Sequence, residues 1–124
     1  MITANPLKDP GSILYKRGVY FDYDSNAVKD EFRPLIQAHA KYLVENRGAS
    51  ARLEGNTDER GSREYNLALG QRRAEAVKKI MTVIGVPEAR LETVSFGKEK
   101  PVAEGHEESS WWKNRRTDVK YRGE

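Results

Sequence analysis

Residues 55–74 read GNTDERGSREYNLALGQRRA, and the rest of the chain can be placed relative to this segment. It starts at the end of a short strand pattern, crosses a polar loop bounded by glycines and then enters a helix. Ser62 is a favourable N-cap, and Gly85 followed by Pro87 supplies a stop. The pattern therefore predicts a helix over residues 63–84.

An arginine lies on the face of this predicted helix that should be apolar. Six apolar residues recur on that face at helical spacing: Leu69, Ala74, Val77, Ile80, Met81 and Ile84. Arg73 is four residues from both Leu69 and Val77, so it falls on the same stripe, beneath the loop that carries Asp58. A guanidinium in that position is desolvated and requires a partner.

Two interpretations of Arg73 follow. In the structural one, Arg73 pairs with Asp58 or hydrogen-bonds loop carbonyls. In the binding one, the two opposite charges stay partly unpaired, so that a zwitterion bridges them with its ammonium on Asp58 and its carboxylate on Arg73. Each charge-assisted hydrogen bond of this kind contributes about 1.5–3 kcal/mol. The residues alone leave both interpretations open.

The composition is typical of a single, well-solvated domain. The chain has 124 residues, 33% of them charged, and its mean hydropathy is -0.82. No apolar run approaches the roughly 18 residues that a membrane helix needs, and residues 1–12 lack the pattern of a signal peptide. Cysteine is absent, which excludes disulfides and thiolate chemistry.

The charge pattern argues against a nucleic-acid surface. The net charge is +3, and basic residues gather late, within residues 113–122, beside two tryptophans. The acidic Glu104, Glu107 and Glu108 just before them cancel much of the field, and no basic–aromatic motif is matched. We therefore expect no nucleic-acid partner.

Catalysis and metal binding find little support either. Asp22, Asp24, Asp58 and Glu59 are candidates for glycan hydrolysis, but acids at strand ends and loop tips usually form turns or caps. No nucleophile-elbow serine or phosphate-binding loop is present. The two histidines belong to no ligand motif, and His39 is predicted to be a hydrogen-bonded core residue. We expect neither catalytic residues nor a metal or cofactor.

The remaining patterns predict an α+β fold after an N-terminal arm at residues 1–12. Strands are expected over 13–23 (with an interruption at Gly18), 51–54, 91–96 and 117–121, a helix over 30–46 and a short helical turn over 107–114. Pro34 is compatible with the helix over 30–46 because it lies in the first turn. The order is β-α-β-α-β-β, which indicates a mixed sheet with helices packed on it.

Several motifs of this chain resemble the peptidoglycan-binding OmpA-like domain. They are TDERG at 57–61, EYN at 64–66, LG at 69–70, RRA at 72–74, VYFD at 19–22 with Asp24, VSFGKEKP at 94–101 and KNRR at 113–116. Within that family the pattern is most similar to the Pal lipoproteins of the Tol-Pal system, over about residues 17 to 122. The motifs are long and occur in the family's order, so the resemblance is specific.

The resemblance implies a domain over residues 13–124 that binds the diaminopimelate of the peptidoglycan stem peptide without catalysis. It places Asp58 and Arg73 on that ligand, and it arranges four more residues around the same pocket: Tyr23, Asp24, Asn56 and Leu69. Two positions depart from the family. Asn56 stands where many members have histidine, and Arg63 stands where Pal proteins often have proline. We expect the pocket to survive both changes.

The resemblance also implies partners and a location. TolB is expected to contact Glu59, Arg60 and Arg72, whose alternative interpretation is solvated surface charge, whereas residues 114–116 are expected to be structural. The implied location is the periplasm, with membrane attachment only through an N-terminal lipid anchor outside this sequence, and the expected state is a monomer. Three alternatives stay open: TolB as the principal ligand, the wall anchor of another OmpA-like protein, and an unanchored protein.

Overall fold

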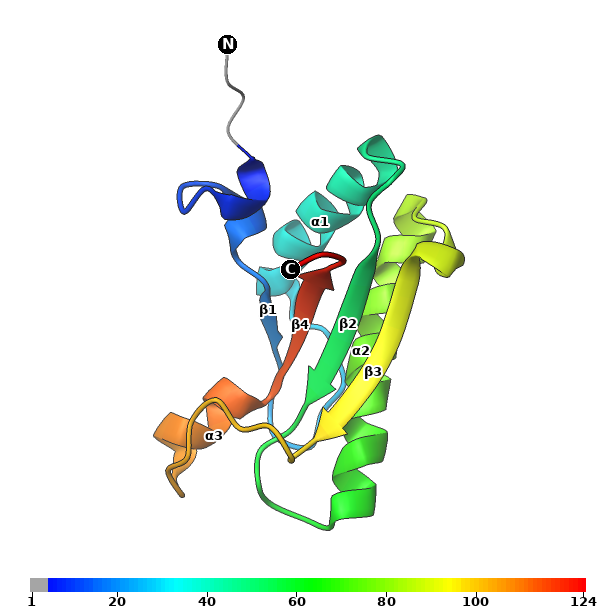
Figure 1. Cartoon of the computed structure of the whole chain (residues 1–124). Coiled ribbons are helices and arrows are strands. Elements are labelled where there is room, and N and C mark those ends of the chain that lie inside the picture. Colours follow the sequence, from blue (N-terminus) through cyan, green and yellow to red (C-terminus); the bar gives the residue numbers. More distant parts are fainter. Residues whose placement is uncertain (1–4) are drawn as a thin grey trace.

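A four-stranded mixed sheet with two long helices on one face forms the body of the domain (Figure 1). The computed structural model describes residues 5–124. The strands are β1 (Gly18–Tyr20), β2 (Ala51–Asn56), β3 (Leu91–Gly97) and β4 (Arg116–Tyr121); the helices are α1 (Arg33–Glu45), α2 (Arg63–Ile84) and α3 (Glu108–Asn114). The sheet order is β1-β4-β2-β3, with only β2 and β3 parallel. The predicted α+β class is confirmed.

The helix α2 has the limits that its sequence signals predict. The Ser62 side chain accepts a hydrogen bond from the Tyr65 N–H, and Gly85 adopts a φ of 130° at the C-cap. Ile84 was expected on the buried stripe but is 42% exposed. The reason is that the chain reverses at Gly85, so that Val86, which is 2% exposed, fills the end of the core instead. Within residues 5–124, no helix is long and apolar enough to cross a membrane.

Two glycines let α2 approach the sheet closely. A Cβ added at Gly55 in β2 would lie 1.8 Å from the carbonyl oxygen of Gly70 in α2. A Cβ added at Gly70 would lie 2.3 Å from Ser95 Oγ in β3. Backbone therefore packs on backbone where β2 ends, and this contact sets the position of Arg73, about one turn further along α2.

The N-terminal segment differs from the strand predicted over residues 13–23. Only Gly18–Tyr20 pairs with β4, because the register reaches no further than Arg116–Asp118. Residues Ile13–Tyr15 instead form a 3-10 turn. Ser12 is its N-cap, and the Ser12 side chain accepts a hydrogen bond from the Leu14 N–H. Before it, Pro6–Lys8 forms another such turn, and Leu7 packs against the core. The domain boundary after residue 12 stays a prediction.

His39 is a buried, hydrogen-bonded core residue, as its apolar setting predicted. Its side chain is inaccessible to solvent, and its two ring nitrogens lie 2.6 Å from the Tyr121 hydroxyl and 2.8 Å from the Lys16 carbonyl oxygen. Since the carbonyl can only accept, Nε2 carries the proton and Nδ1 accepts from the hydroxyl. Burial lowers the pKa of His39 below 6.5.

This histidine should make stability depend on pH below about 7. As pH falls through the unfolded-state pKa of about 6.5, the unfolded chain takes up a proton at His39 more readily than the folded chain, so the free energy of unfolding falls as pH falls, by up to about 1.4 kcal/mol per pH unit. Urea unfolding at several pH values should show that the free energy of unfolding depends less steeply on pH in His39→Gln than in wild type. His106→Gln is the control because that histidine is 80% exposed. An equal dependence of the free energy of unfolding on pH in wild type and His39→Gln would contradict this role of His39.

Candidate functional site

A small pocket lies where β2 ends, between the loop that follows β1, the loop over residues 57–62 and the first turns of α2. Its volume is about 100 Å³, and ten residues line it: Tyr23, Asp24, Thr57, Asp58, Arg60, Gly61, Tyr65, Asn66, Leu69 and Arg73. Three larger hollows contain neither Asp58 nor Arg73, although one of them is lined by Thr57, Glu59 and Asn114. The pocket brings together five of the six residues predicted to bind the ligand.

Arg73 is fully buried at the inner end of this pocket. Its guanidinium donates three hydrogen bonds to main-chain carbonyls: Nε to Ser25 (2.8 Å), Nη1 to Asn56 (2.9 Å) and Nη2 to Asp22 (3.0 Å). It therefore joins the loop after β1 to the end of β2. Of the two structural partners considered from sequence, loop carbonyls are the ones observed, and no ion pair joins Arg73 to Asp58 within the described residues.

Burial lowers the pKa of Arg73 to about 10, so the group is still charged at neutral pH. The opposite charge of Asp58 raises this pKa, and the like charge of Arg115 lowers it. Three of the roughly five guanidinium N–H donors are used by the carbonyls. The others make no hydrogen bond within the described residues, in a setting where electrostatic interactions are strong.

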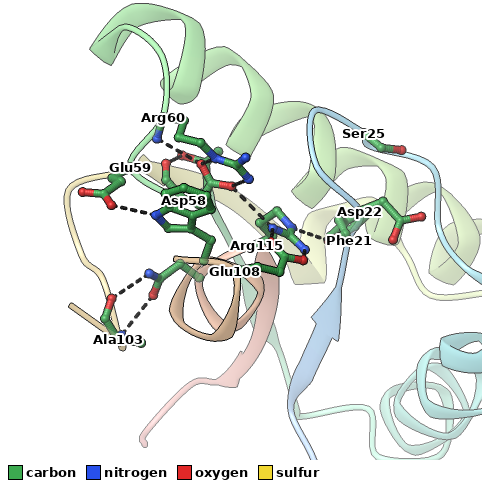
Figure 2. Close-up of polar contacts among 12 residues, drawn as sticks. Phe21, Asp22, Ser25, Asp58, Glu59, Arg60, Ala103, Glu108 and Arg115 are labelled. Carbon is green, nitrogen blue, oxygen red and sulfur yellow. Dashed lines mark hydrogen bonds and ion pairs between the residues drawn. The ribbon is translucent and has the colours of Figure 1, made fainter. Parts of the chain in front are cut away.

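Asp58 is also buried, and its carboxylate is held by two arginines (Figure 2). Arg60 donates from Nη2 to Oδ2 at 2.7 Å and from Nε to Oδ1 at 3.3 Å, and its backbone N–H donates to Oδ1 at 3.0 Å. Arg115 Nη1 lies 3.6 Å from Oδ2. Arg115 is itself paired with Glu108 at 2.8 Å and donates from Nε to the Phe21 carbonyl at 2.9 Å.

Arg60 lies between two aromatic rings while it holds Asp58. Its guanidinium carbon is 3.8 Å from the centroid of the Tyr23 ring and 4.0 Å from that of the Trp111 ring. The Trp111 indole N–H donates to Glu59 at 2.6 Å, and the ring of His106 contacts the same carboxylate (Figure 2 shows the Glu59 contact). Arg60 is therefore a partly exposed loop charge that is held by aromatic and acidic neighbours, with 31% of its side chain exposed.

The other residues predicted from sequence are placed as follows. Asp24 adopts a φ of 53° and accepts a hydrogen bond from the Tyr65 hydroxyl at the mouth of the pocket. Asn56 offers its carbonyl to Arg73, but its side chain turns inward, donates to the Glu54 carbonyl and does not line the pocket. Arg72 is exposed on α2, with its guanidinium carbon 5.9 Å from the centroid of the Tyr65 ring.

Comparison with known proteins shows the family of this chain. The sequence model described as "OmpA family" matches residues 20–115. A curated relative from Pseudomonas aeruginosa, named peptidoglycan-associated lipoprotein, is 49% identical over 114 residues, which is 92% of this chain and 67% of the relative. One of the same name from Pseudomonas putida is 52% identical over 101 residues, 82% of this chain and 60% of the relative. The chain belongs to the OmpA family.

Two solved structures superpose well on this OmpA-family domain. The crystal structure of the peptidoglycan-associated lipoprotein from Burkholderia pseudomallei superposes with a TM-score of 0.93 at 55% identity, covering 95% of this chain and all of that one. The C-terminal domain of Helicobacter pylori MotB superposes with a TM-score of 0.78 over 86% of this chain and 84% of its own, at 22% identity, and shares the fold alone. The chain spans about two thirds of the length of its curated relatives.

Sequence reasoning missed three residues that shape the site of this OmpA-family domain. Tyr65 was singled out only as part of a motif, Trp111 only as one of two tryptophans near basic residues, and Arg115 only within residues 114–116, which were expected to be structural. Asn114 has a structural role, because its side chain bonds both Ala103 backbone groups. Arg115 pairs with Glu108, yet it faces Asp58 as well. The sequence did carry a signal for Arg115, because the KNRR motif at 113–116 follows closely after acidic residues. The position of Arg115 relative to Asp58, however, depends on how α3 packs.

Proposed function

We propose that this OmpA-family domain is a non-catalytic module that binds the stem peptide of peptidoglycan through its diaminopimelate residue and anchors the outer membrane to the wall. The observation that carries the proposal is Arg73, a fully buried cation with unused donors, which lines one pocket with the buried anion Asp58. Relatives named peptidoglycan-associated lipoprotein support peptidoglycan as the polymer that the domain binds.

The chemistry of the pocket suits the zwitterionic end of diaminopimelate. The ligand carboxylate would accept from the free N–H groups of Arg73, and its ammonium would donate to Asp58. Asp24 and the Tyr23 and Tyr65 rings lie at the mouth, where they would contact the carbon chain. A stem peptide with lysine at this position has the ammonium but lacks the carboxylate, so Arg73 would distinguish the two.

The wider setting is part of the same proposal. The relatives' name points to a lipid-anchored protein of the periplasm, and TolB of the Tol-Pal system is the protein partner we propose. Arg72 and Glu59 are exposed and do not line the pocket, so their side chains are available for such a contact. Titration of the domain with TolB, before and after saturation with stem peptide, would show whether the two ligands exclude each other.

Binding to purified sacculi tests the proposal on the natural polymer. The domain should co-sediment with sacculi that contain diaminopimelate, and free diaminopimelate stem peptide should release it. Asp58→Asn should lose about 2–4 kcal/mol of binding free energy because it removes the charge that the ammonium needs. Asp30→Asn is the matched control, since that carboxylate is 97% exposed and outside the pocket. Equal co-sedimentation of all three proteins would refute the site.

A further inference from the structure

The anion of the proposed site already has a cation of the chain's own. Arg60 supplies three hydrogen bonds to the Asp58 carboxylate, two from its guanidinium and one from its backbone. A carboxylate has about four acceptor positions, and Arg115 lies 3.6 Å from the remaining side. A ligand ammonium therefore finds most acceptor positions of Asp58 already occupied by Arg60, with the charge of Arg115 nearby.

The exposure of the two side chains leads to the same conclusion. The Arg60 side chain is part of the pocket lining and is 31% exposed, whereas the Asp58 side chain is 4% exposed. Of these two residues, Arg60 is thus the one whose side chain can move toward solvent.

The two aromatic rings hold Arg60 where it is. The guanidinium carbon of Arg60 lies 3.8 Å from the centroid of the Tyr23 ring and 4.0 Å from that of the Trp111 ring. The hydrogen bond from the Trp111 indole to Glu59 fixes the position of the indole. Stacking and fork-like pairing both depend on the guanidinium shape, so lysine at this position would keep the charge but lose both contacts. Trp111 does not line the pocket and acts on it through Arg60.

We infer that Arg60 is an internal competitor of the ligand ammonium: its guanidinium must leave Asp58 before the diaminopimelate head group can bind. The inference rests on the proposed function and adds a residue that sets the affinity of the same site. When the binding-competent conformation is a minor fraction of the population, the apparent affinity is reduced by that fraction. If Arg60 is displaced about one tenth of the time, removing it should tighten binding about tenfold.

Calorimetric titration with a diaminopimelate stem peptide tests this on three proteins. Arg60→Gln should bind about tenfold more tightly than wild type. Arg63→Gln, with the same change of charge at a residue that is 67% exposed and outside the pocket, should bind like wild type. Unchanged or weaker binding by Arg60→Gln, with wild type still binding, would overturn the inference and leave the proposed function standing. Absence of binding by both proteins would overturn the two together.

A second variant keeps the inference testable if Arg60→Gln fails to fold. Trp111→Leu removes one of the stacked rings and should also tighten binding of the stem peptide. When it is combined with Arg60→Gln, it should have no further effect. In a Trp112→Phe background, Trp111 is the one tryptophan left, since the sequence has two. Its fluorescence should change as the peptide displaces Arg60. Saturating peptide without any change in that fluorescence would contradict the displacement.

Discussion

Replacing Gly55 with alanine is expected to destabilise the fold more than any other single methyl addition described above. The new Cβ would lie 1.8 Å from the Gly70 carbonyl oxygen, which belongs to helix backbone and cannot rotate away. The clash forces α2 off the sheet, and we expect a loss of about 3 kcal/mol in the free energy of unfolding. Because α2 carries Arg73, binding of the stem peptide should weaken in whatever fraction still folds.

Chemical denaturation of the Gly55→Ala and Gly48→Ala variants measures this effect. A Cβ at Gly48 meets nothing within 4 Å, so that variant should stay within about 0.5 kcal/mol of wild type. Gly70→Ala should be intermediate, because its nearest obstacle is the Ser95 side chain, which can change rotamer. Equal unfolding midpoints for Gly55→Ala and Gly48→Ala would show that the close helix–sheet approach is not required.

Replacing Arg73 with methionine should affect stability and binding together. Methionine keeps an apolar stem on the buried stripe but leaves the carbonyls of Asp22, Ser25 and Asn56 without their donor. Buried groups deprived of a partner cost about 1–3 kcal/mol each, so we expect a loss of roughly 3–5 kcal/mol in the free energy of unfolding. Binding of the stem peptide should fall below detection at the same time.

The neighbouring arginine provides the comparison. Arg72→Met changes the same residue type one position earlier on α2, on the exposed face, and should leave stability and stem-peptide binding nearly unchanged. Urea unfolding combined with calorimetry at a temperature where both variants are folded separates the two effects. An Arg73→Met protein with wild-type stability and wild-type affinity would contradict both roles that we assign to this residue.

Local signals explain why so much of the fold was predictable. The limits of α2 follow from Ser62 and Gly85, whose side chain and backbone conformation act on neighbouring residues only. The burial of Arg73 follows from helical periodicity. By contrast, the strand predicted over 13–23 was too long, because β-propensity does not show that residues 13–15 form a 3-10 turn capped by Ser12 and leave β4 unpaired beyond Asp118 on that side.

The partners within the site could not be predicted in the same way. Arg60 is two residues from Asp58, so its pairing was within reach of local reasoning, but its contacts with the rings of Tyr23 and Trp111 were not. Trp111 and Arg115 come from α3 and its C-cap, more than 50 residues after Asp58. Contacts over that separation are determined by how α3 packs, which no periodicity in the sequence encodes.

The most direct test of the proposed site is calorimetric titration of this domain with two stem peptides that differ at one residue, diaminopimelate in one and lysine in the other. If Arg73 reads the ligand carboxylate, the diaminopimelate peptide should bind at least about tenfold more tightly, since one charge-assisted hydrogen bond contributes about 1.5–3 kcal/mol. Equal binding of the two peptides, or binding of neither, would contradict the account.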